Sequence, residues 1–468
     1  MSTTSINHID ISVELQQSIN SDLANHFKIV PKSISDDTFS FYTDSENESN
    51  LKSIKDELEL ILNKNIELEL TSSDIIRKSL SIYYRNKQKT RPVSFSNNFL
   101  EELIFEAKDI SASDIHIEVY EKDARVRLRI DGQLIEKNII KKENYLELIN
   151  QIKIKSNLDI TEKRLPQDGR IEYEDFDIRV SILPTHYGEK VVMRILGRNA
   201  SSLDINQLGF EDKDLKLYLE AVRKTNGIVL ISGPTGSGKT TTLYATLKHL
   251  NDIKRNIVTV EDPIEYTLKG INQVQLKENI GLTFTSALRS FLRQDPDIIM
   301  LGEIRDSQTA QMAIRASLTG HLVLSTIHTN SSIGTISRLM DMEALGFLIA
   351  ETINISVAQR LVRLLCENCK KETSVDLEDF PKNFVIPQTI EKHYLPVGCE
   401  ECYHTGYKGR KAIYEILPIT SEVAAAIKSN TIENSDFITG EKLSDKAFQI
   451  FAKGITSLDE IYPILINS

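Results

Sequence analysis

The chain has 468 residues, of which 40% are hydrophobic and 26% charged, and its formal net charge is −11. This length is too great for one ordinary core and predicts about two to four domains, and the composition is that of a folded chain. The acidic balance argues against nucleic acid or anionic lipid as the main partner, because proteins that bind phosphate backbones usually carry a basic surface.

Residues 1–30 lack the basic start and apolar run of a secretory signal, and no apolar stretch approaches the roughly 20 residues that span a bilayer. We therefore expect a cytoplasmic protein without a membrane span, peripheral to a membrane only through partners. The Lys- and Arg-containing stretch 85–91 is the best candidate for a basic patch, and we interpret it as a solvated linker.

The N-terminal residues 1–90 are expected to form a small α/β unit followed by that linker. Residues 1–30 carry apolar residues at helical spacing, and Pro31 is expected to stop the helix. Short alternating runs such as 38–42 follow, and a second amphipathic helix is expected over 50–62.

A second, α+β domain is expected over 91–200. It should open with a helix over 97–107 and continue with strands at 114–119, 125–130, 175–182 and 190–196. Apolar residues alternate with arginines in the second of these strands, which is the period of a half-buried strand, and Asp131-Gly132 supplies a hairpin turn. The polar segment 197–207 is expected to link to the next domain.

From Gly227 the pattern changes to short, almost wholly apolar runs separated by helices. The runs are 228–231, 257–260, 298–301 and 322–324, and they are typical of strands buried on both faces of a parallel sheet. We expect an α/β core over 201–365, a compact cysteine-containing insert over 366–412 and a helical region over 413–468.

One segment of this core carries the strongest chemical signal, Gly233-Pro234-Thr235-Gly236-Ser237-Gly238-Lys239-Thr240, which follows an apolar strand and opens a helix. Its glycines let backbone N–H groups wrap an anion, and the helix aims its positive end at that anion. Lys239 is a point charge for β- and γ-phosphates, and the Thr240 hydroxyl is placed to coordinate Mg²⁺. The segment predicts a loop that holds the phosphates of ATP.

Carboxylates follow two of the buried strands. Glu303 ends the run 297–303, and acids at the carboxyl end of a parallel strand lie beside the phosphate crevice, where Glu303 can take the proton of an attacking water. Glu261 opens the acidic stretch 261–265 and can order Mg²⁺-bound water or assist Glu303, whereas helix capping by Asp262 is the structural alternative.

Two histidines flank the run 322–326. His321 and His328 can each hydrogen-bond a γ-phosphate, and each can equally be a structural histidine with its bonds satisfied locally.

The four cysteines lie in two Cys-x-x-Cys pairs, Cys366 with Cys369 and Cys399 with Cys402. In a reducing cytosol this arrangement favours a metal over disulfides. Four thiolates form a closed, structural shell around one tetrahedral Zn²⁺, which can hold together an insert too small for its own core. The alternative is four thiols without metal.

The segments 233–240, 260–266, 301–306 and 319–330 occur in an order that resembles the secretion ATPase superfamily of type II secretion and type IV pilus assembly, over most of residues 95–420. The family names them the Walker A, Asp, Walker B and His boxes. The resemblance implies that Glu303 is the catalytic glutamate, with Glu261 and His328 as further catalytic candidates. It also implies that Arg179 and Arg194 reach the nucleotide as arginine fingers, where strand-surface salt bridges would be the structural alternative. Weaker candidates are Arg289 and Arg293.

The resemblance further implies a fold class, a multidomain α/β protein with a RecA-like P-loop core, a preceding α+β domain, a small N-terminal docking domain and a four-cysteine zinc module. Partners would be five further copies in a homo-hexamer, an inner-membrane platform protein and a membrane adaptor. The segment that binds a cyclic dinucleotide in some relatives is not evident in this sequence. The four-cysteine module is typical of assembly rather than retraction ATPases.

The expected function is thus a cytoplasmic ATPase motor for a type II secretion pseudopilus or a type IV pilus, with ATP, Mg²⁺ and Zn²⁺ and without nucleic acid. Two other classes stay open, a DNA-translocating motor on a RecA-like core and a nucleotide-dependent scaffold that does not hydrolyse ATP.

Overall fold

The structure is a computed structural model that describes residues 9–35, 37–84, 91–92, 98–197, 204–388, 390–432 and 441–466. Most of the expected linker 85–91 and of the expected link 197–207 lies outside these residues. Among the described helices, none combines the length and the apolar character that crossing a membrane requires.

The N-terminal unit is a three-stranded sheet with helices packed on it. Its elements are α1 (Val13–Gln17), α2 (Ser21–Phe27), β1 (Ile29–Ile34), β2 (Thr38–Asp44), α3 (Leu51–Leu62), β3 (Asn65–Thr71) and α4 (Ser73–Tyr83). The strand order is β1-β2-β3, with β1 antiparallel and β3 parallel to β2. The prediction that Pro31 stops the first helical region was wrong. Helix α2 ends earlier, at Lys28 in a left-handed conformation, and Pro31 lies in the edge strand β1, where its missing N–H is tolerated.

The second unit is a seven-stranded sheet with two helices. Its elements are β4 (Arg91–Pro92), α5 (Phe99–Asp109), β5 (Asp114–Val119), β6 (Asp123–Ile130), β7 (Gln133–Lys141), α6 (Lys142–Lys155), β8 (Gln167–Glu172), β9 (Phe176–Thr185) and β10 (Gly188–Gly197), in the strand order β4-β7-β6-β5-β10-β9-β8. The buried side chains of α5 and α6 form one core with the apolar face of the sheet. The predicted opening helix and the four predicted strands are confirmed, whereas β7, α6 and β8 were not predicted.

The third unit is the α/β core. It contains α7 (Asp212–Val222), β11 (Gly227–Ser232), α8 (Lys239–Leu250), β12 (Ile257–Glu261), β13 (Asn272–Gln275), α9 (Phe284–Phe291), β14 (Ile298–Leu301), α10 (Ser307–Leu318), β15 (Leu322–Ile327), α11 (Ser332–Asp341), α12 (Gly346–Thr352), β16 (Ile353–Leu365) and β19 (Tyr407–Pro418). The strand order is β13-β12-β14-β15-β11-β16-β19, and every neighbouring pair is parallel except β16 with β19. One core cluster joins the sheet to α9–α12, and the other joins it to α7 and α8, which gives three layers.

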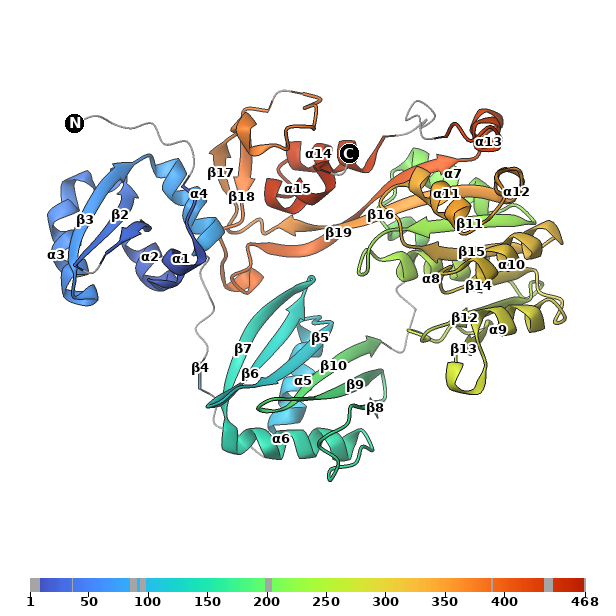
Figure 1. Cartoon of the computed structure of the whole chain (residues 1–468), viewed down its shortest axis with the longest axis horizontal. Helices are drawn as coiled ribbons and strands as arrows, with labels where there is room; N and C mark the ends of the chain where they lie inside the picture. Colours follow the sequence, from blue (N-terminus) through green and yellow to red (C-terminus); the bar gives the residue numbers. More distant parts are fainter. Residues whose placement is uncertain are drawn as a thin grey trace.

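The chain leaves this sheet at the end of β16, forms the cysteine-containing insert, and returns along β19 (Figure 1). The insert contains β17 (Lys371–Ser374) and β18 (Lys392–Leu395), and after β19 follow α13 (Ser421–Lys428), α14 (Leu443–Ala452) and α15 (Leu458–Leu465). The helical region predicted from residue 413 therefore starts at Ser421. The reason is that 412–417 are buried in succession and pair with β16, so the expected boundary at residue 412 falls within a strand.

Two polar residues of the hairpin between β6 and β7 tie it to the insert end of β16 and β19. The Asp131 carboxylate accepts a hydrogen bond from the Gly409 N–H at 2.7 Å and lies 3.4 Å from the Arg410 Nε. Gln133 accepts a bond from the Arg363 guanidinium at 2.6 Å. The position of the second unit in this structure is thus fixed partly by residues of β16 and β19 near the insert.

Candidate nucleotide site and cysteine cluster

The predicted phosphate loop connects β11 to α8, and its glycines are required by its shape. Gly233 and Gly238 have φ angles of +148° and +88°, which side chains other than glycine rarely adopt. A Cβ on Gly233 would lie 2.5 Å from the Gln359 carbonyl oxygen, and one on Gly238 would lie 2.8 Å from the Gln359 Nε2. The inner side of the loop is therefore filled by β16, and only the backbone fits.

A cavity of about 520 Å³ opens over this loop. Its walls bring together the predicted loop with Glu261, Glu303 and His328. The lining residues are Thr235, Gly236, Ser237, Gly238, Lys239, Thr240, Thr241, Leu243, Glu261, Asp262, Pro263, Glu265, Tyr266, Met300, Gly302, Glu303, Arg305, Thr326, His328, Leu361 and Arg410. A pocket of this size, lined by both cationic and acidic side chains, suits a triphosphate and a divalent cation.

Lys239 is buried at the base of the cavity, with 9% of its surface exposed. Its ammonium donates to the carbonyl oxygens of Gly233 at 2.8 Å and Pro234 at 3.1 Å. Burial lowers the pKa of Lys239, and the Glu303 carboxylate opposes that shift. A charge with so little solvent around it is worth more to a phosphate than one in water.

Glu303 follows β14 and faces the cavity, with 16% of its side chain exposed. It forms an ion pair with Arg305, and its carboxylate lies 3.4 Å from the His328 Nε2. Thr326 in β15 fixes the backbone on both sides of Glu303, because its hydroxyl donates to the Gly302 carbonyl at 2.7 Å and its carbonyl accepts from the Ile304 N–H at 2.9 Å. This anchoring places a carboxylate opposite the phosphate loop.

Glu261 lies at the end of β12 with 3% of its surface exposed. It accepts hydrogen bonds from the Tyr244 hydroxyl, from Thr259 Oγ1 at 2.5 Å and from Gln273 Nε2 at 3.1 Å. These bonds position the carboxylate against the cavity wall. Its assistance to catalysis stays a prediction.

The structure separates the two histidines. His321 Nδ1 lies 2.9 Å from the Ala316 carbonyl at the end of α10, and the residue does not line the cavity. His328 lines the cavity beside Glu303, with 51% of its side chain exposed. The capping alternative for Asp262 was wrong, since no helix begins there and Asp262 lines the cavity.

The predicted arginine fingers lie on the second unit, in a row of charges that crosses five strands. The register pairs Arg170 of β8 with Arg179 of β9, Arg179 with Arg194 of β10, Arg194 with Asp114 of β5, and Asp114 with Arg129 of β6. Directly opposed side chains of an antiparallel sheet share one face, and like charges there repel. The row therefore places Arg179 directly between two other arginines.

The three arginines on β8, β9 and β10 differ in their partners. Arg170 forms an ion pair with Asp177, and Arg194 donates to Asp114 at 2.8 Å. The Arg179 side chain has neither an ion pair nor a hydrogen bond within the part of the chain that the structure describes. Neither Arg179 nor Arg194 lines the cavity of its own chain, although the Glu265 carboxylate of the cavity wall contributes to raising the pKa of Arg194, after its bond to Asp114.

Several lining residues were missed by the sequence analysis, above all Arg305 and Arg410. Arg305 stands two residues after Glu303 and forms an ion pair with it, which spacing alone did not single out. Arg410 comes from β19, and only the antiparallel pairing with β16 brings it to the loop. The weaker candidates Arg289 and Arg293 do not line the cavity.

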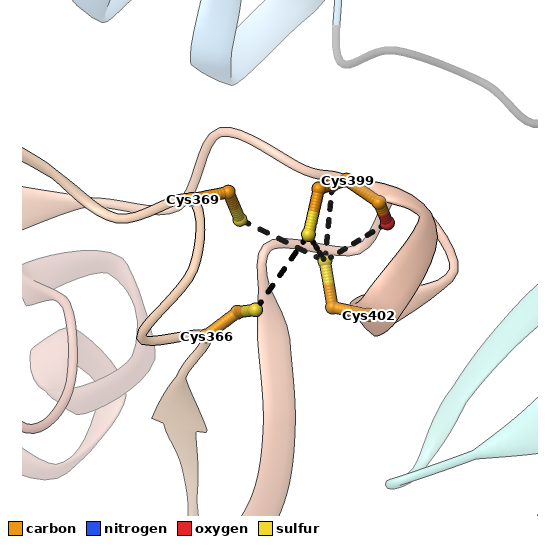
Figure 2. A group of neighbouring side chains, drawn as sticks. All are labelled: Cys366, Cys369, Cys399 and Cys402. Atoms are coloured by element: carbon orange, nitrogen blue, oxygen red, sulfur yellow. Dashed lines mark hydrogen bonds between the residues drawn. The ribbon is translucent and has the colours of Figure 1, made fainter.

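The four cysteines converge from two turns at the insert end of β16 and β19 (Figure 2). Their sulfurs all lie within 4.8 Å of one another, and three of the distances, Cys366–Cys399, Cys369–Cys402 and Cys399–Cys402, are 3.8 Å. Tetrahedral coordination with Zn–S bonds of about 2.3 Å places sulfurs about 3.8 Å apart. The geometry thus fits a tetrahedral metal ion, and it is too open for a disulfide.

Backbone donors also face these sulfurs. Cys402 Sγ accepts from the N–H groups of Cys399 and Gly406, each at 3.2 Å. Burial raises the pKa of the Cys402 thiol, but these donors, together with contacts from the thiols of Cys369 and Cys399, lower the pKa overall. Donors of this kind stabilise the thiolate form that metals bind.

Comparison with known proteins agrees with this site. The family model of the type II/IV secretion system protein matches residues 89–463. This chain belongs to that family. A type II secretion system protein E from Pseudomonas aeruginosa is 45% identical over 370 residues, which are 77% of this chain and 74% of that protein. The type IV pilus assembly ATPase PilB from Myxococcus xanthus is 41% identical over 453 residues, which are 87% of this chain and 79% of that protein.

Solved structures show the same fold. The Legionella pneumophila ATPase DotB matches with a TM-score of 0.61 at 22% identity, over 82% of this chain and all of DotB. The pilus retraction motor PilT with bound ADP matches with a TM-score of 0.55 at 25% identity, over 78% of this chain and 96% of PilT. Together with the family match, these findings establish the multidomain α/β fold with its P-loop core and identify the chain as an ATP-hydrolysing enzyme.

Replacing Gly238 with Ala tests the constraint on the loop. We expect the dissociation constant for ATP to rise about tenfold or more, because the side chain strains the backbone by roughly 1–2 kcal/mol and displaces Gln359. Equilibrium binding of a fluorescent ATP analogue measures the change. Gly281→Ala is the matched control, since Gly281 has a similar φ of +82° and nothing within 4 Å of its Cβ position. Equal affinities in the two variants would contradict the account.

Proposed function

We propose that this chain is the ATPase motor that drives assembly of a type II secretion pseudopilus or a type IV pilus. The observation that carries the proposal is the pairing of a complete phosphate cavity, with Glu303 facing Lys239, and an arginine row on a separate unit. Chemistry that needs groups from two units is coupled to their relative movement, which is what a motor requires.

In the proposed reaction the loop backbone and Lys239 hold the β- and γ-phosphates. The Thr240 hydroxyl, exposed in the cavity, would hold Mg²⁺, with Glu261 and Asp262 on the facing wall, and the ion would neutralise phosphate charge. Glu303 takes a proton from the attacking water, and His328 orients the carboxylate.

Arg179 and Arg194 act as arginine fingers in this proposal. Arg179 lies between Arg170 and Arg194 in this row and has no anionic partner among the described residues, and the transferring phosphoryl group would supply one. Because neither side chain lines its own cavity, the fingers require either rotation of the second unit or a neighbouring subunit. A homo-hexameric ring with the nucleotide between the two large domains satisfies this requirement.

The remaining parts receive structural and docking roles. The four cysteines are proposed to bind one Zn²⁺ that holds the insert together. Residues 9–84 form a core cluster of their own, which supports a docking domain over 1–90 for a membrane adaptor. Through it and a platform protein, the motor would work at the cytoplasmic side of the inner membrane. For the rest of the chain we propose the domain boundaries expected from the sequence, which are 91–200, 201–365, 366–412 and 413–468. Strand β19 crosses the last of these boundaries.

The DNA-translocating motor is not favoured. The relatives at 41–45% identity are a type II secretion protein and a pilus assembly ATPase, and the chain carries a net charge of −11. Intact Lys239, Thr240 and Glu303 also disfavour a scaffold that does not hydrolyse ATP.

Glu303→Gln should retain ATP binding and lose turnover, by about 10²–10⁴-fold, because the amide cannot accept the proton of water. Phosphate release and equilibrium nucleotide binding measure the two properties. Glu278→Gln serves as the control, since Glu278 is an acid outside the cavity lining. Turnover at the wild-type rate in Glu303→Gln would refute the assignment of the base.

Arg179→Gln should reduce turnover of the assembled oligomer by about 10³-fold or more while the melting temperature stays unchanged, since arginine fingers contribute roughly 10³–10⁵ in rate. Arg164→Gln is the control, because that side chain is 88% exposed and pairs only with Glu162 among the described residues. If both variants hydrolyse ATP equally well, Arg179 is a structural residue of the sheet surface and not an arginine finger.

Cys402→Ser should lose the bound metal and lower the melting temperature, because structural zinc sites contribute about 10–16 kcal/mol in small domains. Metal content by mass spectrometry and thermal unfolding are the measurements, and the wild-type protein should carry one zinc per chain. The control Glu401→Gln changes an exposed neighbour that pairs with Lys408 and should keep the metal. A wild-type protein purified without zinc would overturn the assignment.

A further inference from the structure

Arg360 is a partly buried cation next to the phosphate loop, and none of the roles above uses it. It follows Gln359 on β16, and the last residue pair between β11 and β16 is Ser232 with Ala358. Gln359 and Arg360 therefore run past the end of β11 and lie against the loop. A Cβ on Gly233 would be 3.3 Å from the Arg360 Nη1.

The hydrogen bonds of Arg360 join two segments of the site. Its Nη1 donates to the Gln359 carbonyl at 3.0 Å, and its Nη2 donates to the Asn330 carbonyl at 2.9 Å and to the Asn330 Oδ1 at 3.3 Å. One guanidinium thus ties the loop after His328 to β16, the strand that packs against the phosphate loop. The planar fork of arginine is suited to such bonds in two directions.

Arg360 has no ion pair among the described residues, which is unusual for a guanidinium with this burial. Burial lowers its pKa, and Glu415 opposes the shift only from a distance. The Glu415 carboxylate is occupied elsewhere, by the N–H and hydroxyl of Ser332 at 2.8 and 2.7 Å and by the N–H of Leu443 at 3.1 Å. Arg360 is therefore held by hydrogen bonds to neutral oxygens rather than by a salt bridge.

Asn330 lies two residues after His328, between the end of β15 at Ile327 and the capping residue Ser331 of α11. Asn330 and His328 are both exposed, whereas Thr329 between them is half-buried and hydrogen-bonds the Ser331 carbonyl at 3.1 Å and the Thr335 hydroxyl at 3.0 Å. The bond from Arg360 to the Asn330 carbonyl adds a constraint from β16 to this stretch. His328 Nε2 in turn lies 3.4 Å from the Glu303 carboxylate.

We propose that Arg360 is a positioning residue for ATP hydrolysis, which ties the loop after His328 to β16, the strand packed against the phosphate loop, and so sets His328 against Glu303. This inference rests on the roles proposed above for Glu303 and His328. Arg360 does not line the cavity, so it acts through Asn330 and His328 rather than on the phosphates.

Arg360→Gln in the full-length, assembled protein is the first test. We expect kcat to fall about tenfold or more, because small misplacements of a catalytic group have effects of this size, while the dissociation constant of a non-hydrolysable ATP analogue changes less than about threefold. Arg360→Lys should restore kcat only in part, because an ammonium lacks the fork. Arg338→Gln, which removes an exposed arginine of α11, is the control and should match the wild type.

Asn330→Ala gives an independent test that leaves the fold intact, since Asn330 is exposed. It should reduce kcat less than Arg360→Gln does, because the backbone acceptor remains. In the double variant, the loss should not exceed that of Arg360→Gln alone, since both changes break one connection. Multiplied losses would overturn the inference, and so would a loss of analogue affinity equal to the loss of kcat, which indicates direct phosphate contact.

Glu303→Gln measured in parallel separates the two claims. Full turnover in Arg360→Gln together with lost turnover in Glu303→Gln would overturn only the positioning role. Full turnover in Glu303→Gln would overturn the proposed base itself.

Discussion

Gln359 of β16 packs so closely behind the phosphate loop that Gly233 and Gly238 have no room for a side chain, and this constraint shapes the rest of the core. The N–H groups of the loop must converge on one anion, so the segment needs left-handed and open backbone conformations that glycine alone supplies at Gly233 and Gly238. The space behind the loop is then filled from another strand, by Gln359 of β16. Its side chain accepts a bond from Thr242 in the first turn of α8, so the loop and the helix that follows it share one support.

β16 also connects this support to the cysteine cluster. Its residues pair with β19 from Ile355 to Leu365, and β19 brings Arg410 into the cavity wall. β16 ends and β19 begins at the insert, where Cys366 directly follows β16 and Cys402 precedes β19. A metal bound there would fix the separation of the two strand ends, and with it the register that places Arg410. The cysteine cluster is thus structurally linked to the nucleotide site without contacting the nucleotide.

Features whose pattern lies within one short segment could be predicted from the sequence. The loop, the buried strands β11, β12, β14 and β15, and the two cysteine pairs each depend on local pattern, and the structure has the four strands and brings the four sulfurs together. Pairings between distant segments escaped prediction. Residues 407–412 were assigned to the insert and 413–418 to the helical region, and together they form a strand because β16 offers them an unpaired edge.

The same limit explains the site residues that were missed. Arg360 and Arg410 are ordinary strand arginines in the sequence, and only the crossing of β16 under the loop and the antiparallel return of β19 give them chemical neighbours. The side-chain network of Glu261 likewise involves Tyr244 and Gln273 from other elements. Local pattern therefore identifies what binds the phosphates, and long-range pairing decides which cations surround them.

The link between the second unit and the core gives a physical reason why nucleotide binding can move domains. Asp131, at the hairpin between β6 and β7, contacts both the Gly409 N–H and the guanidinium of Arg410, and Arg410 also lines the cavity. A nucleotide that draws Arg410 toward its phosphates competes with Asp131 for the same charge, because one guanidinium cannot serve both in full. The unit held by Asp131 is the one that carries Arg179 and Arg194. Arg410 is thus a cation that the cavity wall shares with the contact to the unit that carries Arg179 and Arg194.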